Sequence, residues 1–173
     1  MQALTETNKV AKPSTLILGI GNYLMGDEGI GVHVANVMSQ MDLPGNVFVL
    51  DGGTGGFHLL EYFEEFEHVI LIDATLDEQE PGSIRTIKPR YAKDFPAAMS
   101  THDIGLKDLV SALQLLNKMP IIDLVVVSIA SIQQQGIELT KDVESQIPSV
   151  IASVLRLLQF NKGEKQLEST YVF

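Results

Sequence analysis

Apolar and polar residues alternate along the chain in blocks that predict strands and helices in turn. Runs rich in Val, Ile and Leu predict five strands, at residues 15–20, 46–51, 68–73, 83–88 and 121–129. Three of these runs are almost continuously apolar, which is typical of strands that are covered on both faces. Apolar residues recur at helical spacing in four further segments: 28–41, 57–63, 106–116 and 140–158.

This order of elements predicts an α/β fold with a twisted, mostly parallel five-stranded sheet and helices on both faces. The strand at 83–88 is the exception, because only a polar connection through Glu80-Pro81-Gly82 separates it from the strand before. A connection of that kind has no crossover helix, so we expect this strand to be antiparallel or at an edge. In the last helical segment, Thr140 is a good N-cap, and Pro148 should begin a new segment or kink the helix.

Composition and charge narrow the class of protein. The 173 residues predict one domain, 1–173, with a loose leader at 1–13 and a mobile polar tail at 161–173. The chain has no cysteine, which excludes thiolate metal sites and a cysteine nucleophile and fits a cytoplasmic protein. The net charge of −10 disfavours nucleic acid and anionic membranes as partners. No apolar run is long enough for a membrane span, and we expect a monomer.

The stretch GIGNYLMGDEGIG, residues 19–31, follows the first predicted strand. Glycine-rich loops at this position often bind phosphate, but Asp27 and Glu28 stand where a P-loop has Lys and Ser or Thr, and carboxylates repel an anion. The dinucleotide fingerprint also fails, because Leu24 occupies its last glycine position. Asp51 lies about 30 residues on rather than the roughly 20 that the fingerprint requires. A first-turn role that complements the helix dipole is the simpler interpretation for Asp27.

Candidate chemistry lies at the carboxyl ends of the predicted strands, where ligands bind in such sheets. Glu28 follows the first strand, Asp73 ends the third, and His102 lies in a loop ahead of the third helix. Two carboxylates and an imidazole suit a borderline divalent ion such as nickel or zinc and leave coordination positions open. The spacing is long-range, so two alternatives stay open: His102 could cap the following helix, and Asp73 could hydrogen-bond a loop.

The remaining polar candidates have simpler interpretations. We interpret His33, His58 and His68 as structural or surface residues, and Asp77 and Asp103 as a loop residue and a helix N-terminal residue.

The segment DGGTGG, residues 51–56, predicts a substrate-binding loop made of Asp51, Gly52, Gly53 and Thr54. Its glycines indicate positive φ angles or a close approach to a partner, although a plain flexible turn is an equal alternative. On the first interpretation, a bulky residue at Gly52 or Gly53 spoils docking and leaves the melting temperature nearly unchanged.

Over residues 15–160 the sequence resembles the maturation endopeptidases of nickel-iron hydrogenases. The motifs that carry the resemblance are GIGNYLMGDEGIGVHV at 19–34, DGGTGG at 51–56, LIDA at 71–74, Pro81-Gly82 and STHDIGL at 100–106. The resemblance implies a five-stranded sheet with flanking helices, as the periodicity also predicts. It also implies that Glu28, Asp73 and His102 are the metal-binding and catalytic residues, and that the glycines of the first motif bring backbone close to a metal centre carried by the substrate.

The resemblance implies an endopeptidase that removes the C-terminal extension of a hydrogenase large-subunit precursor after nickel insertion. The nickel would come with the substrate, and zinc or another divalent ion could occupy the site in vitro. The metal could polarise the scissile carbonyl, activate water, or report that nickel is present. The rival hypothesis is a non-enzymatic nickel-dependent docking or chaperone module for the same precursor. A nucleotide-binding domain is a more distant alternative, which the carboxylates disfavour.

One segment departs from the family pattern. Members of the family tend to carry a Pro-acid pair in the loop after the last strand, whereas this chain has Gln133-Gln134-Gln135 there. The difference leaves open which hydrogenase isoenzyme is the partner.

Overall fold

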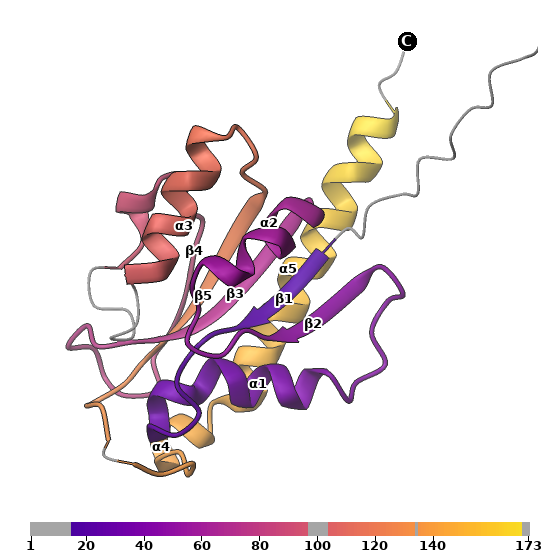
Figure 1. Cartoon of the computed structure of the whole chain (residues 1–173). Coiled ribbons are helices and arrows are strands. Elements are labelled where there is room, and N and C mark those ends of the chain that lie inside the picture. The colour runs from indigo at the N-terminus through magenta and orange to yellow at the C-terminus, as the bar shows by residue number, and fades with distance from the viewer. Residues whose placement is uncertain (1–14, 97–103, 134, 171–173) are drawn as a thin grey trace, which may run out of the picture.

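Five strands form a single sheet in the order β2-β1-β3-β5-β4 (Figure 1). The structure is a computed structural model that describes residues 15–96, 104–133 and 135–170. The strands are β1 (Thr15–Gly19), β2 (Val47–Asp51), β3 (His68–Thr75), β4 (Ile84–Ile87) and β5 (Ile121–Ser128). β1, β2, β3 and β5 run parallel, and β4 pairs antiparallel with β5 at the edge. The structure thus confirms the predicted five-stranded, mostly parallel sheet and the antiparallel edge position of the strand that follows Pro81-Gly82.

Helices cover both faces of the sheet (Figure 1). The α-helices are α1 (Ile30–Met38), α2 (Leu60–Glu65), α3 (Ile104–Leu115), α4 (Lys141–Glu144) and α5 (Ile147–Thr170), and the 3-10 turns are η1 (Gly26–Gly29), η2 (Phe57–Leu59) and η3 (Ala92–Asp94). α2 and α3 pack on the face that presents Val69 and Leu71. α1 and α5 pack on the opposite face, against Ile70 and Ile72. This alternation is what a strand buried on both sides requires.

The last helical segment differs from its prediction in two ways. Pro148 is the second residue of α5, in the first turn, where its missing N–H costs no hydrogen bond. The helix then continues through Thr170, whereas the sequence predicts a tail from Asn161. Thr140 holds the N-cap position of α4, but its hydroxyl does not cap that helix and donates instead to Asp27. The predicted leader at 1–13 lies outside the described residues.

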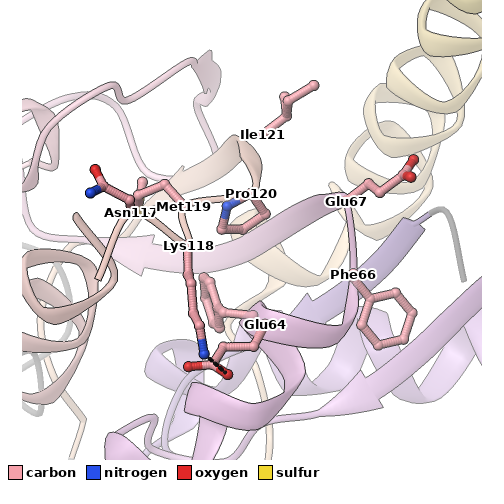
Figure 2. A pocket seen from close by; sticks show the side chains of 9 residues that line it. Glu64, Phe66, Glu67, Asn117, Lys118, Met119, Pro120 and Ile121 are labelled. Carbon is pink, nitrogen blue, oxygen red and sulfur yellow. Dashed lines mark hydrogen bonds and ion pairs between the residues drawn. The ribbon is translucent and has the colours of Figure 1, made fainter. Parts of the chain in front are cut away.

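Two polar features lie at the amino ends of β3 and β5. The buried His68 ring contacts Asp123 through Nε2, at 2.8 Å, which confirms a structural role for this histidine. Nearby, a pocket lies between the segments that lead into β3 and β5. Two of its lining residues, Lys118 and Glu64, form an ion pair of 2.8 Å (Figure 2). Within the part of the chain that the structure covers, no helix has the length and apolar character needed to cross a membrane.

Candidate functional site

The glycines of the first motif pack the chain against its own backbone. A Cβ atom on Gly19 would lie 2.1 Å from the carbonyl oxygen of Gly31, and a Cβ on Gly31 would lie 2.2 Å from the carbonyl oxygen of Ile72. A Cβ on Gly21 would lie 2.0 Å from the carbonyl oxygen of Glu28. Only glycine permits contacts this close. Packing within the chain therefore explains why Gly19, Gly21 and Gly31 are glycine, and their approach to a metal centre of the substrate stays a prediction.

This packing places Glu28 against the carboxyl ends of the central strands. Glu28 lies in η1, which contacts β3, and its side chain is fully buried. Asp73 lies near the end of β3 and is also fully buried, with Oδ1 accepting a hydrogen bond of 2.8 Å from the N–H of Ala74. Burying carboxylates is costly unless cations or hydrogen-bond donors compensate. Two buried acids on contacting elements therefore place carboxylate oxygens, which are common ligands of divalent cations, at this end of the sheet.

The third predicted ligand, His102, lies outside the described residues. Strand alternation puts Asp73 on the same face as Val69 and Leu71, which is the face covered by α2 and α3. α3, the first described element after His102 in the sequence, begins at Ile104 and packs on that face. Among residues 15–96, 104–133 and 135–170, no three His, Asp or Glu side chains form an ion-sized group. The three-residue site remains a prediction.

Asp27 does more than complement a helix dipole, which is the role that the sequence favours for it. Its carboxylate is 1% exposed and accepts hydrogen bonds from Gln133 Nε2 at 2.7 Å, from the Thr140 N–H at 2.7 Å and from the Thr140 hydroxyl at 2.8 Å. The N–H of Asp27 donates to Gln133 Oε1 at 2.9 Å. We call these three residues the clasp. Its hydrogen bonds hold the segment after β5 against the turn that carries Glu28.

The same segment makes three further contacts near the clasp. The N–H of Gly26 donates to the carbonyl of Gly136 at 2.7 Å, and the N–H of Gly136 donates to the carbonyl of Leu24 at 2.9 Å. His33 of α1 hydrogen-bonds the backbone of Ile137, and burial lowers the pKa of His33 more than this bond and the charge of Glu144 raise it. A neutral His33 fits the structural role that the sequence predicts.

The other histidine with a predicted role is His58, at the start of the second helical segment. Its side chain is exposed, as expected for a surface residue.

The predicted substrate loop lies next to this site, and its glycines differ from one another. The N–H of Gly21 donates to the carbonyl of Gly53 at 2.8 Å, and Asp51 Oδ1 accepts from the N–H of Gly53 at 2.8 Å. Asp51 and Thr54 are exposed. Gly53 has a φ of 53° and open space around its Cβ position. Gly52 is buried, and a Cβ there would lie 2.7 Å from Leu18 Cδ1.

These surroundings predict different outcomes for substitutions at the two glycines. Gly52→Ala should lower the free energy of unfolding by about 1–3 kcal/mol, because the new methyl overpacks the buried Leu18. Gly53→Asn should change it by less than about 0.5 kcal/mol, since asparagine tolerates positive φ and the position is open. Urea unfolding of both variants measures the difference, and equal losses would show that the loop is a uniformly flexible turn. These surroundings therefore predict a loss of stability at Gly52 in place of the unchanged stability expected from the sequence, and they leave the expectation for Gly53 as it was.

Sequence comparison identifies the class of protein. A family profile described as hydrogenase maturation protease matches residues 32–157. The hydrogenase 2 maturation protease of Escherichia coli K12 is 34% identical over 147 residues, which cover 83% of this chain and 90% of that protein. The hydrogenase expression/formation protein HupD of Rhizobium leguminosarum is 32% identical over 151 residues, which cover 85% of this chain and 75% of HupD.

Solved structures agree with the sequence comparison. The hydrogenase maturating endopeptidase HybD from E. coli superposes with a TM-score of 0.79 at 34% identity, over 86% of this chain and 93% of that one. The hydrogenase maturation protease HybD from Thermococcus kodakarensis superposes with a TM-score of 0.68 at 26% identity, over 83% of this chain and 98% of that one. The chain belongs to the hydrogenase maturation protease family, and it is a peptidase of that type.

Proposed function

We propose that this peptidase removes the C-terminal extension from the large-subunit precursor of a nickel-iron hydrogenase, in the cytoplasm, after nickel has been inserted. The observation that carries the proposal is the pair of fully buried carboxylates, Glu28 and Asp73, on contacting elements at the carboxyl end of the sheet. Buried acids at this place need a cation or donors, and the family supplies the proteolytic chemistry and the class of substrate.

In this proposal nickel is part of the substrate. Carboxylate oxygens of Glu28 and Asp73, with the imidazole of His102, occupy positions that the precursor's own nickel ligands leave open. Oxygen and nitrogen ligands of this kind discriminate poorly between nickel and zinc, so selectivity comes from the precursor's site. Three such ligands without a thiolate should hold a free ion no better than about micromolar, or roughly −8 kcal/mol.

The surface around the carboxylates supports a protein substrate. Leu24 is 62% exposed after β1, Phe57 is 58% exposed after the glycine loop, and Ile137 is 49% exposed after β5. Apolar side chains exposed together with polar neighbours are a feature of protein-protein contact sites. We propose that the precursor docks on these residues and on the loop of Asp51, Gly52, Gly53 and Thr54, where Gly52 shapes the loop from inside and the exposed Asp51 and Thr54 make the contacts.

A processing assay tests this function. Purified protein is mixed with nickel-loaded precursor, and the mass of the large subunit is followed with time. The proposal predicts a shortened large subunit and a released C-terminal peptide. A stable complex with a full-length precursor would instead favour the docking or chaperone module.

A further inference from the structure

The clasp joins two parts of the chain whose relative position decides where Glu28 lies. Asp27 is the residue next to Glu28 in η1, and Gln133 and Thr140 belong to the segment after β5. Asp27 is buried, and its hydrogen bonds to the half-buried Gln133 and the exposed Thr140 are short and satisfy both oxygens of its carboxylate. Asp27 is thus a buried charge held by a specific set of donors, as buried charges require.

We propose that Asp27 and Gln133 are positioning residues for the peptidase reaction, which fix the direction of the Glu28 carboxylate through the four-residue turn that both acids share. The inference rests on the proposed function, since it assigns Glu28 to the site. Neither residue needs to touch the precursor. A small displacement of a reacting group lowers the reaction rate strongly. Loss of the clasp hydrogen bonds should therefore lower kcat and leave KM nearly unchanged.

The direction of each hydrogen bond makes the clasp an acid-amide pair with one allowed arrangement. Gln133 uses its oxygen to accept from the N–H of Asp27 and its nitrogen to donate to the Asp27 carboxylate. Asp27→Asn cannot satisfy this arrangement. If the new amide nitrogen faces Gln133 it meets a donor, and if it faces the backbone of Thr140 it meets another. Rotation of the Gln133 amide only moves the conflict to the N–H of residue 27.

Gln133→Glu fails for the opposite reason. One oxygen of the new carboxylate can still accept from the N–H of Asp27, but the other faces an oxygen of Asp27 across the 2.7 Å contact. Two ionised carboxylates at that distance repel each other, and the repulsion is relieved only when one of them takes up a proton.

The double variant, Asp27→Asn with Gln133→Glu, restores complementarity with the roles exchanged. The new amide nitrogen donates to the new carboxylate, and the new amide oxygen accepts from the Thr140 N–H in place of Asp27 Oδ1. The Thr140 hydroxyl turns to accept, which a hydroxyl can do. The pair still carries one negative charge, which now lies on residue 133 instead of residue 27.

The experiment measures kcat and KM of full-length wild type, both single variants and the double variant on nickel-loaded precursor. Each single substitution should lower kcat by about tenfold or more, and the double variant should recover most of the loss. His68→Gln is the matched control: it weakens the buried contact with Asp123 at the other end of the sheet and should lower stability without lowering kcat. Full kcat in Asp27→Asn, or a double variant no better than the worse single one, would overturn the proposal.

Hydrogen exchange at the amides of residues 26–29 separates this inference from the proposed function. Exchange should be faster in each single variant and return towards wild type in the double variant. If wild-type protein leaves the precursor uncut, the proposed function is wrong, and the exchange result still decides whether the clasp fixes the turn. Unchanged exchange in all variants would overturn the positioning role.

Discussion

Glu28→Gln should abolish processing while the fold is retained. The substitution keeps the shape of a fully buried side chain and removes its charge, so the proposed ligand is lost with little change in packing. The rate should fall by roughly 100-fold or more, since loss of a residue that only supports a metal ligand already costs about 10- to 100-fold. Asp73→Asn and His102→Ala should behave in the same way, because each removes one of three proposed ligands.

The control for this series is Glu61→Gln, which removes the same charge from an exposed position on α2. Its processing rate and melting temperature should both match wild type. Initial rates of large-subunit shortening and thermal unfolding are measured on all variants. A Glu28→Gln protein that cleaves at the wild-type rate would remove Glu28 from the site. One that loses activity only in proportion to lost stability would make Glu28 a structural residue.

Gly31→Ala should lower the free energy of unfolding more than the addition of a methyl group at Gly52 or Gly45. The added Cβ would lie 2.2 Å from the carbonyl oxygens of both Ile20 and Ile72, which are backbone atoms that no rotamer change can move. We expect a loss of more than about 4 kcal/mol, at the extreme of what single substitutions cause, or a chain that does not fold. The contact lies between the start of α1 and the two strands beside the site, so its loss also separates Glu28 from Asp73.

Gly45→Ala is the matched control. Gly45 lies before β2, and a Cβ there would have no atom within 4 Å. The free energy of unfolding should change by no more than about 0.5 kcal/mol. Urea unfolding compares the two variants. Equal stability in both would mean that α1 can move away from β1 and β3 without cost, and that Gly31 is not needed for their close packing.

The sheet could be predicted from the sequence because its signals are local. Burial on both faces makes β3 and β5 almost continuously apolar, and the short connection through Pro81-Gly82 predicts that β4 is antiparallel or at an edge. Pro148 marks the start of α5 because proline fits the first turn of a helix. The positions of Glu28 and Asp73 at strand ends follow from the same logic, since parallel strands bring their carboxyl ends to one edge.

The clasp could not be predicted, because its signals are not local. Gln133 is 106 residues from Asp27 and Thr140 is 113 residues away, and an acid at the start of a helix has an adequate local explanation. Likewise, Gly52 and Gly53 look alike in sequence, and only the structure shows that Leu18 packs against Gly52 while Gly53 has a positive φ and open space beside it. The sequence also predicts a tail from Asn161, whereas α5 continues through Thr170. A polar segment after an amphipathic helix has no apolar pattern that would distinguish a tail from a continuation of the helix.

The most direct test of the proposed function compares cleavage of nickel-loaded and nickel-free precursor by enzyme that has been stripped of metal. The proposal predicts that metal-free enzyme shortens the nickel-loaded precursor and leaves the nickel-free one intact. Free nickel or zinc added to the enzyme alone should not rescue cleavage of the nickel-free precursor, because the weak three-ligand set is completed only on the substrate. An enzyme that purifies with one firmly bound zinc, and loses activity when that zinc is removed, would be an ordinary zinc protease and would contradict the proposal that the substrate supplies the metal.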